Sequence, residues 1–155
     1  MPSLTREVAA AAVPETVFTS REVVCHHCAA RWEEPVARVV NVSTAPDARL
    51  GILLGTMHRA ACRACAAVQT LDVIVDYYDP ERALLVQIRP AWERAAGGED
   101  WYWARLEELV LRYAELPARV EVVFGFGEMV ARYLGGEAAI AAAREEWAAR
   151  RARKD

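Results

Sequence analysis

The chain has 155 residues, of which 54% are hydrophobic and 26% are charged, a balance typical of one globular domain with a buried core. Its formal net charge of −3 argues against a general binder of nucleic acids, because phosphate binding depends on clustered positive charge. No stretch reaches the roughly 18 consecutive apolar residues that a membrane-spanning helix needs, and no signal peptide is recognisable. The sequence therefore predicts a cytoplasmic protein that is not associated with a membrane.

Residues 1–14 are predicted to form an N-terminal leader, and β-favouring residues follow it. They occur within residues 16–24 and lead directly into the first of two cysteine pairs, Cys25 and Cys28. Residues 36–42 are again rich in valine and are predicted to return as the other arm of a hairpin. This first cysteine pair is therefore expected to lie in the turn between two strands.

The second cysteine pair, Cys62 and Cys65, follows a short predicted helix over residues 49–54. Residues 70–78 have a strongly β-favouring composition, and residues 83–88 are predicted to form their partner strand after a proline-containing turn. The second pair is thus also expected on a loop beside β-structure.

The character of the sequence changes after Pro90, where helical patterns become dominant. A break and candidate linker is expected at residues 95–98, before an amphipathic helix over residues 100–115 with Asp100 as its N-cap. A short strand is predicted at residues 119–124. Two further helices are expected over residues 128–134 and 137–153.

All four cysteines belong to the two C-x-x-C pairs, which residues 29–61 separate, a spacer of 33 residues. Such a duplicated pair is typical of a four-thiolate zinc site, because each pair forms a tight turn that directs two sulfurs toward one ion. Iron in a rubredoxin-like site would use the same ligands and stays the minor alternative. The predicted metal ligands are Cys25, Cys28, Cys62 and Cys65.

A structural metal is favoured over a catalytic one, since four thiolates leave no open position for water. His26 and His27 lie inside the first pair and could replace a thiolate, but they are interpreted as exposed loop residues or donors to sulfur. His58 stands four residues before Cys62. No nucleophile motif such as G-x-S-x-G is present. We therefore expect no catalytic or organic-cofactor site.

The order of these features resembles the bacterial CpXC domain. A cysteine pair, a strand, a short helix, a second pair and a β-hairpin with a Tyr-Tyr-Asp turn cover roughly residues 18–90, and residues 122–129 resemble a segment that often follows that domain. The resemblance implies a four-cysteine, zinc-ribbon-like metal site and no assigned reaction. His26 departs from the family pattern, in which a proline usually follows the first cysteine.

The sequence thus predicts an α+β protein in three parts. Residues 1–14 form the leader, residues 15–90 a zinc-ribbon-like β region with two cysteine knuckles, and residues 91–155 a mostly helical region packing on it. The leading function is a small cytoplasmic zinc-binding protein that acts as an interaction or scaffold module. Its expected partner is another protein, since the aromatic cluster of residues 101–103 could form a binding surface.

Two other functions are alternatives to this one. A nucleic-acid-binding zinc ribbon would need a basic stripe near the cysteine pairs, but acidic residues lie among the available arginines: Glu33, Glu34 and Asp47 among Arg31, Arg38, Arg59 and Arg63. An enzyme would need a pocket with converging titratable groups and is the least favoured function.

Overall fold

A computed structural model describes residues 13–154 and shows a mixed α+β fold built on a five-stranded sheet. The leader predicted for residues 1–14 lies almost entirely outside the described residues. The strand order is β1-β2-β5-β6-β7, with antiparallel pairing of β1 to β2 and of β5 to β6, and parallel pairing of β2 to β5 and of β6 to β7. The strands are β1 (Val17–Val24), β2 (Arg31–Asn41), β5 (Val75–Asp79), β6 (Leu84–Arg89) and β7 (Arg119–Phe124).

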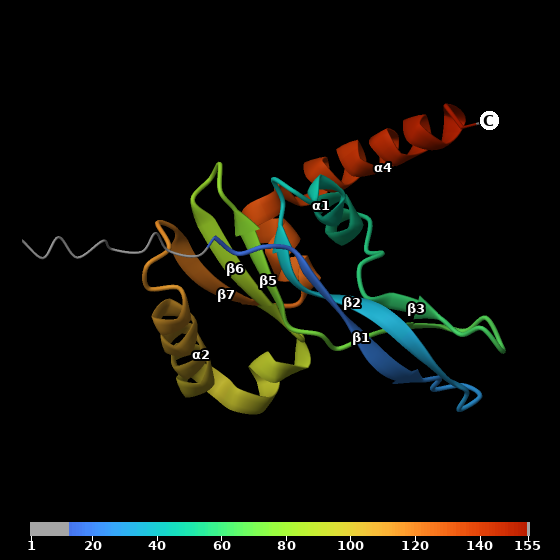
Figure 1. The fold of residues 1–155 in the computed structure, drawn as a ribbon, viewed down its shortest axis with the longest axis horizontal. Coiled ribbons are helices and arrows are strands. Elements are labelled where there is room, and N and C mark those ends of the chain that lie inside the picture. Colours follow the sequence, from blue (N-terminus) through green and yellow to red (C-terminus); the bar gives the residue numbers. More distant parts are fainter. Residues whose placement is uncertain (1–12, 155) are drawn as a thin grey trace, which may run out of the picture.

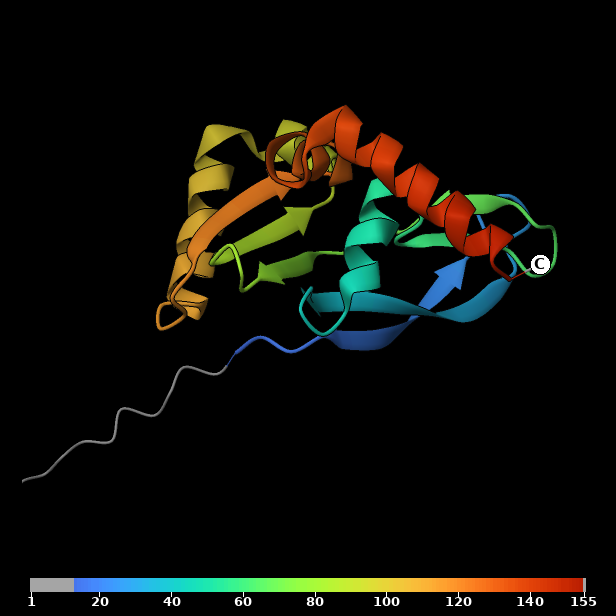
Figure 2. The ribbon, with the colours of Figure 1, turned by 90° about the horizontal axis from the view of Figure 1, so that it is seen from above.

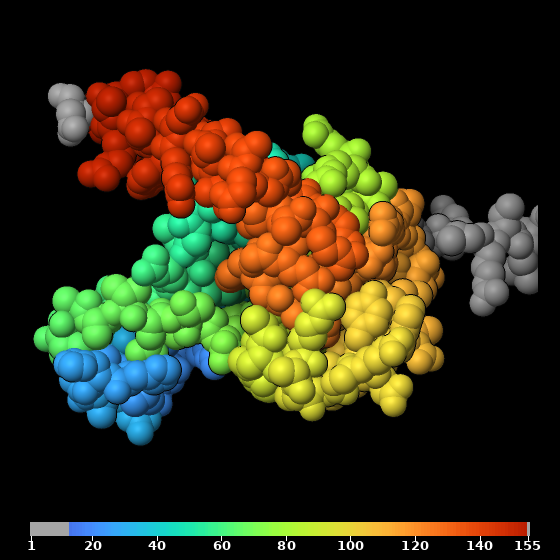
Figure 3. Space-filling model, turned by 180° about the vertical axis from the view of Figure 1, so that it is seen from behind, coloured from blue at the N-terminus to red at the C-terminus, as the bar shows by residue number. Residues whose placement is uncertain are grey.

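A second sheet of two short strands lies beside the far end of the β1–β2 hairpin. It is an antiparallel ribbon of β3 (Arg59–Ala61) and β4 (Val68–Thr70), and Figures 1 and 3 show it against the hairpin tip. The prediction of one strand over residues 70–78 is therefore wrong, because β4 ends before the chain crosses to the large sheet. Leu71 and Val73 of the crossing segment enter the core, and the N–H of Leu71 donates to the carbonyl of His58 at 2.7 Å.

Helices cover both faces of the large sheet (Figures 1 and 2). The main core includes Val86 and Ile88 of β6 and packs against three helical segments, whereas Leu85 points to the opposite face and packs against α2. The alternation of side chains along a strand explains this division. The helical segments on the side of the main core are α1 (Pro46–Leu53), α3 (Phe126–Met129) continued by the π-helix η1 (Val130–Leu134), and α4 (Gly136–Ala152). Helix α2, on the opposite face, spans Trp92–Arg112.

Helix α2 begins earlier than predicted and is kinked rather than interrupted by a linker. Gly98 has a non-helical backbone, with φ 65° and ψ −165°, while the residues on both sides are helical. Gly97 allows the kink, because a Cβ atom there would lie 2.2 Å from the Trp101 side chain. The predicted break at residues 95–98 therefore occurs at Gly98, as a kink without a linker, whereas the predicted N-cap at Asp100 is wrong, since Asp100 lies inside α2.

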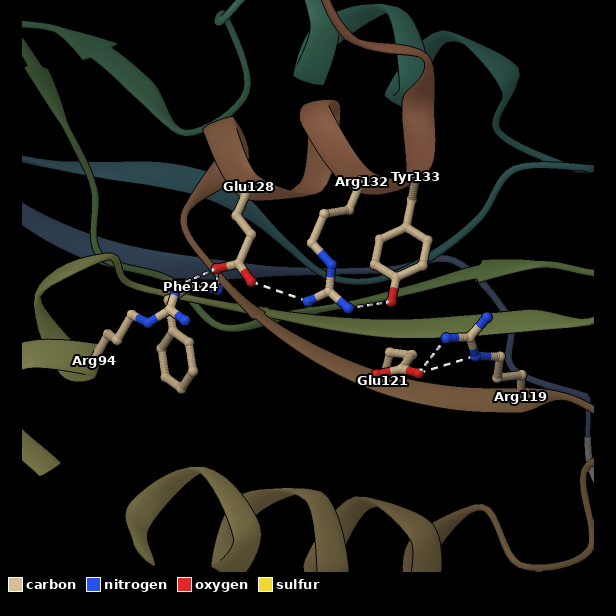
Figure 4. A network of polar contacts seen from close by, with 7 residues as sticks. All are labelled: Arg94, Arg119, Glu121, Phe124, Glu128, Arg132 and Tyr133. Carbon is tan, nitrogen blue, oxygen red and sulfur yellow. Dashed lines mark hydrogen bonds and ion pairs between the residues drawn. The ribbon is translucent and has the colours of Figure 1, made fainter. Parts of the chain in front are cut away.

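The predicted strand over residues 119–124 is confirmed as β7. The helix predicted over residues 128–134 differs from the structure, in which four α-helical residues are followed by a π-helical turn. Glu128 holds this turn in place, accepting a hydrogen bond from the backbone N–H of Phe124 at 3.0 Å. It also pairs with Arg94 at 3.3 Å and with Arg132 at 3.0 Å (Figure 4). Glu128 thereby connects α2, β7 and η1.

The region after residue 90 contributes to the large sheet as well as covering it. Strand β7 pairs in parallel with β6 from Leu84↔Arg119 to Arg89↔Phe124. By contrast α4 extends away from the sheet in Figure 1, with Ala143 as its buried residue. Among residues 13–154, no helix has both the length and the apolar character required to span a membrane.

Candidate metal centre

The first cysteine pair lies on a six-residue turn between β1 and β2, which we call the first cysteine turn (residues 25–30). The backbone N–H of Cys25 donates to the carbonyl oxygen of Ala30 at 2.8 Å, and the N–H of Ala29 donates back to the carbonyl of Cys25 at 2.9 Å. Ala29 has a positive φ of 61°, which closes the turn. The N–H of His27 points at the Cys25 Sγ atom, 3.4 Å away.

The second cysteine turn (residues 62–67) joins β3 to β4 and repeats this geometry. The N–H of Cys62 donates to the carbonyl of Ala67 at 2.8 Å, and the N–H of Ala66 donates to the carbonyl of Cys62 at 2.9 Å. Ala66 has a φ of 62°, and the N–H of Ala64 lies 3.4 Å from the Cys62 Sγ atom. Two segments of different sequence therefore form the same turn, with cysteines at its first and fourth positions.

The two turns bring all four sulfur atoms together, within 4.8 Å of one another. Cys25 Sγ lies 3.7 Å from Cys65 Sγ, and Cys28 Sγ lies 3.6 Å from Cys62 Sγ. A regular tetrahedron with metal–sulfur bonds of about 2.3 Å has edges of roughly 3.8 Å, so the observed separations fit one zinc-sized ion. The four thiols are free of disulfide bonds.

The backbone of each turn also stabilises the thiolate form of its first cysteine. Backbone N–H groups of Cys28 and His27 lower the pKa of Cys25 to about 6. The N–H of Cys65, with a smaller contribution from that of Ala64, lowers the pKa of Cys62. Because the thiolate is the form that binds metals, this favours metal binding by the first cysteine of each turn, whereas burial and the neighbouring sulfurs raise the pKa of Cys28 and of Cys65.

The three histidines occupy different environments, and the cluster of potential ligands found within residues 13–154 consists of the four cysteines. His26 and His27 are exposed on the first turn. His58 is buried, and its Nε2 atom accepts a hydrogen bond from the backbone N–H of Ala37 in β2 at 3.1 Å. His58 therefore attaches the ribbon of the second turn to the large sheet.

Sequence reasoning did not identify two residues that support the cluster. One is His58, considered only as a neighbour of the metal, and the other is Gln69 of β4. The Gln69 side chain accepts a hydrogen bond from the N–H of His26 and donates one to the carbonyl of Val24, each at 3.1 Å. Aligning the two cysteine pairs places Gln69 opposite Trp32, so this position differs chemically between two otherwise equivalent hairpins. That difference was the available sequence signal for Gln69.

These observations define a class of protein: a mixed α+β fold in which two hairpins meet at a cluster of four thiols that is compatible with metal binding. Comparison with protein-family models agrees with this class. The model described as CpXC protein matches residues 23–134, which include all four cysteines, and the chain belongs to this family. The chain matches no curated protein and no solved structure.

Proposed function

We propose that this protein binds one zinc ion through Cys25, Cys28, Cys62 and Cys65, and that the ion has a structural role. The observation that carries the proposal is the convergence of four free thiols at separations of 3.6 and 3.7 Å between the turns. Four thiolates complete a tetrahedral shell, so no position is left for a reacting water. Iron binds the same ligand set and is the alternative metal.

The structural role follows from where the two turns are attached. The first turn belongs to the five-stranded sheet and the second to the separate β3–β4 ribbon. An ion between them would link two sheets that share no backbone ladder. We therefore propose that zinc fixes the ribbon against the hairpin and gives this end of the molecule one defined shape.

We further propose that the protein acts in the cytoplasm as an interaction or scaffold module for another protein. The outward face of α2 supports this role, since Trp103, Val110 and Leu111 are 56%, 46% and 70% exposed. Exposed aromatic and aliphatic side chains on one helix face are common at protein interfaces. The four reduced thiols are compatible with a cytoplasmic location.

A nucleic-acid-binding zinc ribbon is the second candidate, favoured by the exposed Arg59 and Arg63 at the second turn. Two of the other arginines that it would use are already engaged. Arg31 pairs with Glu22 at 2.6 Å, and Arg38 donates to the hydroxyl of Thr19 at 3.3 Å. These contacts favour a protein partner over a nucleic acid.

Elemental analysis of the purified protein tests the metal proposal, with one zinc per chain as the expected result. Cobalt substitution should give intense thiolate-to-metal charge-transfer bands, which Cys62→Ser should weaken and the matched control Ala64→Ser should preserve. A chain that binds no zinc under reducing conditions would overturn the proposal. Capture of partners from the native host, compared between the wild type and Trp103→Ala, tests the interaction role.

A further inference from the structure

The side chain of Gln69 connects the two cysteine turns without any metal. Its amide oxygen accepts the N–H of His26 and its amide nitrogen donates to the carbonyl of Val24, both at 3.1 Å. These two backbone groups lie on either side of Cys25. A side-chain amide has the donor and the acceptor of a peptide group, so Gln69 engages the hairpin as a neighbouring strand would.

This contact is made in one direction only, although the two turns have the same backbone. Gln69 is the second residue of β4 and pairs with Ala60, while Trp32 is the second residue of β2 and pairs with Val23. The two positions are therefore equivalent in the two hairpins. Trp32 has no amide, and its Nε1 donates instead to Glu34 at 2.8 Å. The ribbon thus holds the first turn through the two hydrogen bonds of Gln69, which we call the Gln69 clamp. The hairpin has no equivalent clamp on the second turn.

The position of the clamp determines what it can do. It fixes the residues that flank Cys25, the buried thiol whose Sγ lies 3.7 Å from that of Cys65. Cys65 is four residues before Gln69 on the same hairpin. Gln69 therefore sets the distance between the two halves of the thiol cluster from one end of the β3–β4 ribbon.

We propose that Gln69 is a positioning residue that holds the two cysteine turns at metal-binding distance before the ion arrives. The inference rests on the proposed function, metal binding by the four cysteines. A site that is already assembled loses less conformational freedom when the ion binds, so its affinity is higher. Removing the clamp keeps all four cysteine ligands in the chain but requires the ion to order the ribbon when it binds.

Zinc affinity of the full-length protein, measured by competition with a chromophoric chelator, tests this role. Gln69→Leu should weaken the affinity about tenfold, since two hydrogen bonds that order the metal-free site are lost. Gln69→Glu can still accept from His26 but cannot donate to Val24, so its affinity should lie between those of Gln69→Leu and the wild type. Thr70→Val, the neighbouring position on β4, is the matched control and should bind like the wild type.

Amide hydrogen exchange in the metal-free protein separates positioning from a general loss of stability. The N–H of His26 should exchange faster in Gln69→Leu, while the exchange of the β5–β6 ladder stays unchanged. Equal zinc affinities for the wild type and Gln69→Leu would overturn the inference, as would an equal loss in Thr70→Val. A wild type that binds no zinc would instead overturn the proposed function.

Discussion

The two cysteine turns have the same backbone geometry but very different support. The first turn joins β1 and β2, which have 8 and 11 residues, and β2 also pairs with β5 inside the large sheet. The second joins β3 and β4, which have 3 residues each and pair only with one another. Two turns of the same backbone geometry are therefore supported by unequal amounts of β-structure.

This difference separates what makes a cysteine turn from what keeps it in position. The turn itself is local, because two backbone hydrogen bonds and one residue with positive φ define it in both cases. Its position depends on the surrounding structure. For the second turn, the contacts beyond the ribbon include the buried His58 and the clamp of Gln69. A two-stranded ribbon is marginally stable alone, so the second turn should depend more strongly on metal.

Removal of the metal should produce the largest effect and should separate the two turns. Treatment with a strong chelator under reducing conditions should raise hydrogen exchange in β3 and β4 far more than in the ladder between β1 and β2, because without the ion the short ribbon is held at the hairpin by few contacts, among them those of His58 and Gln69. Structural zinc has an apparent binding free energy of about 10–16 kcal/mol in finger peptides, far more than a three-residue ladder supplies. Hydrogen exchange read residue by residue measures the outcome.

The variant Cys62→Ser should reproduce this pattern without a chelator, and Ala64→Ser provides the control in the same turn. Equal loss of protection in β1 and in β3 would contradict the proposed difference in support. It would instead indicate that the whole region of residues 15–90 unfolds without metal. Unchanged protection of both hairpins after proven metal removal would exclude a structural role for the ion.

Loss of the His58 anchor should have an intermediate effect. In His58→Phe the ring volume is retained, but the buried N–H of Ala37 loses its acceptor, at a cost of about 1–3 kcal/mol. Chemical denaturation of the zinc-loaded protein measures the change in the free energy of unfolding. His27→Phe, on the exposed part of the first turn, should stay within about 0.5 kcal/mol of the wild type. A larger loss in the control than in His58→Phe would contradict the anchoring role.

The same histidine should make stability depend on pH. Burial lowers the pKa of His58 to about 4 from 6.5, so the folded state keeps the imidazole neutral while the unfolded chain takes up a proton. The contribution of His58 is therefore complete above pH 6.5 and is lost as the pH falls toward 4. The stability advantage of the wild type over His58→Phe should shrink between pH 7 and 5. A constant difference across this range would show that His58 does not titrate in this way.

The sequence was most informative where the structure is determined locally. The cysteine spacing indicated the clustered thiols, because each C-x-x-C pair specifies its own turn, and the β-favouring composition of residues 119–124 identified β7. The ribbon strand β3 was missed, since three residues carry too little pattern to be recognised. The division of residues 70–78 was missed for another reason: tertiary burial of Leu71 and Val73 outweighs their β-propensity.

The supporting residues of the cluster were beyond sequence reasoning because their contacts join distant segments. Gln69 reaches a turn more than 40 residues away in the chain, and His58 reaches the middle of β2. Nothing in the residues next to them specifies these partners. The kink of α2 was foreseen as a break at residues 95–98, but its extent depends on how Trp101 packs against Gly97.

The smallest effect should come from the alanine with positive φ in each cysteine turn, and it offers the finest comparison of the turns. Ala29 and Ala66 have φ values of 61° and 62°, a region in which a Cβ atom costs about 1–2 kcal/mol and glycine does not. Since glycine also raises the entropy of the unfolded chain, each substitution to glycine should stabilise the zinc-loaded protein by about 0.5–1 kcal/mol.

Because the two φ values agree, Ala29→Gly and Ala66→Gly should raise the thermal midpoint of the zinc-loaded protein by similar amounts. The metal-free protein should distinguish them. To the extent that the β3–β4 ribbon opens without zinc, Ala66 is as free before global unfolding as after it, so the stabilisation by Ala66→Gly should shrink. Ala29→Gly should keep its effect, since the hairpin that holds it remains folded. Calorimetry of both variants with and without zinc measures the four values, and an equal gain from both in the metal-free protein would show that the second turn stays formed without the ion.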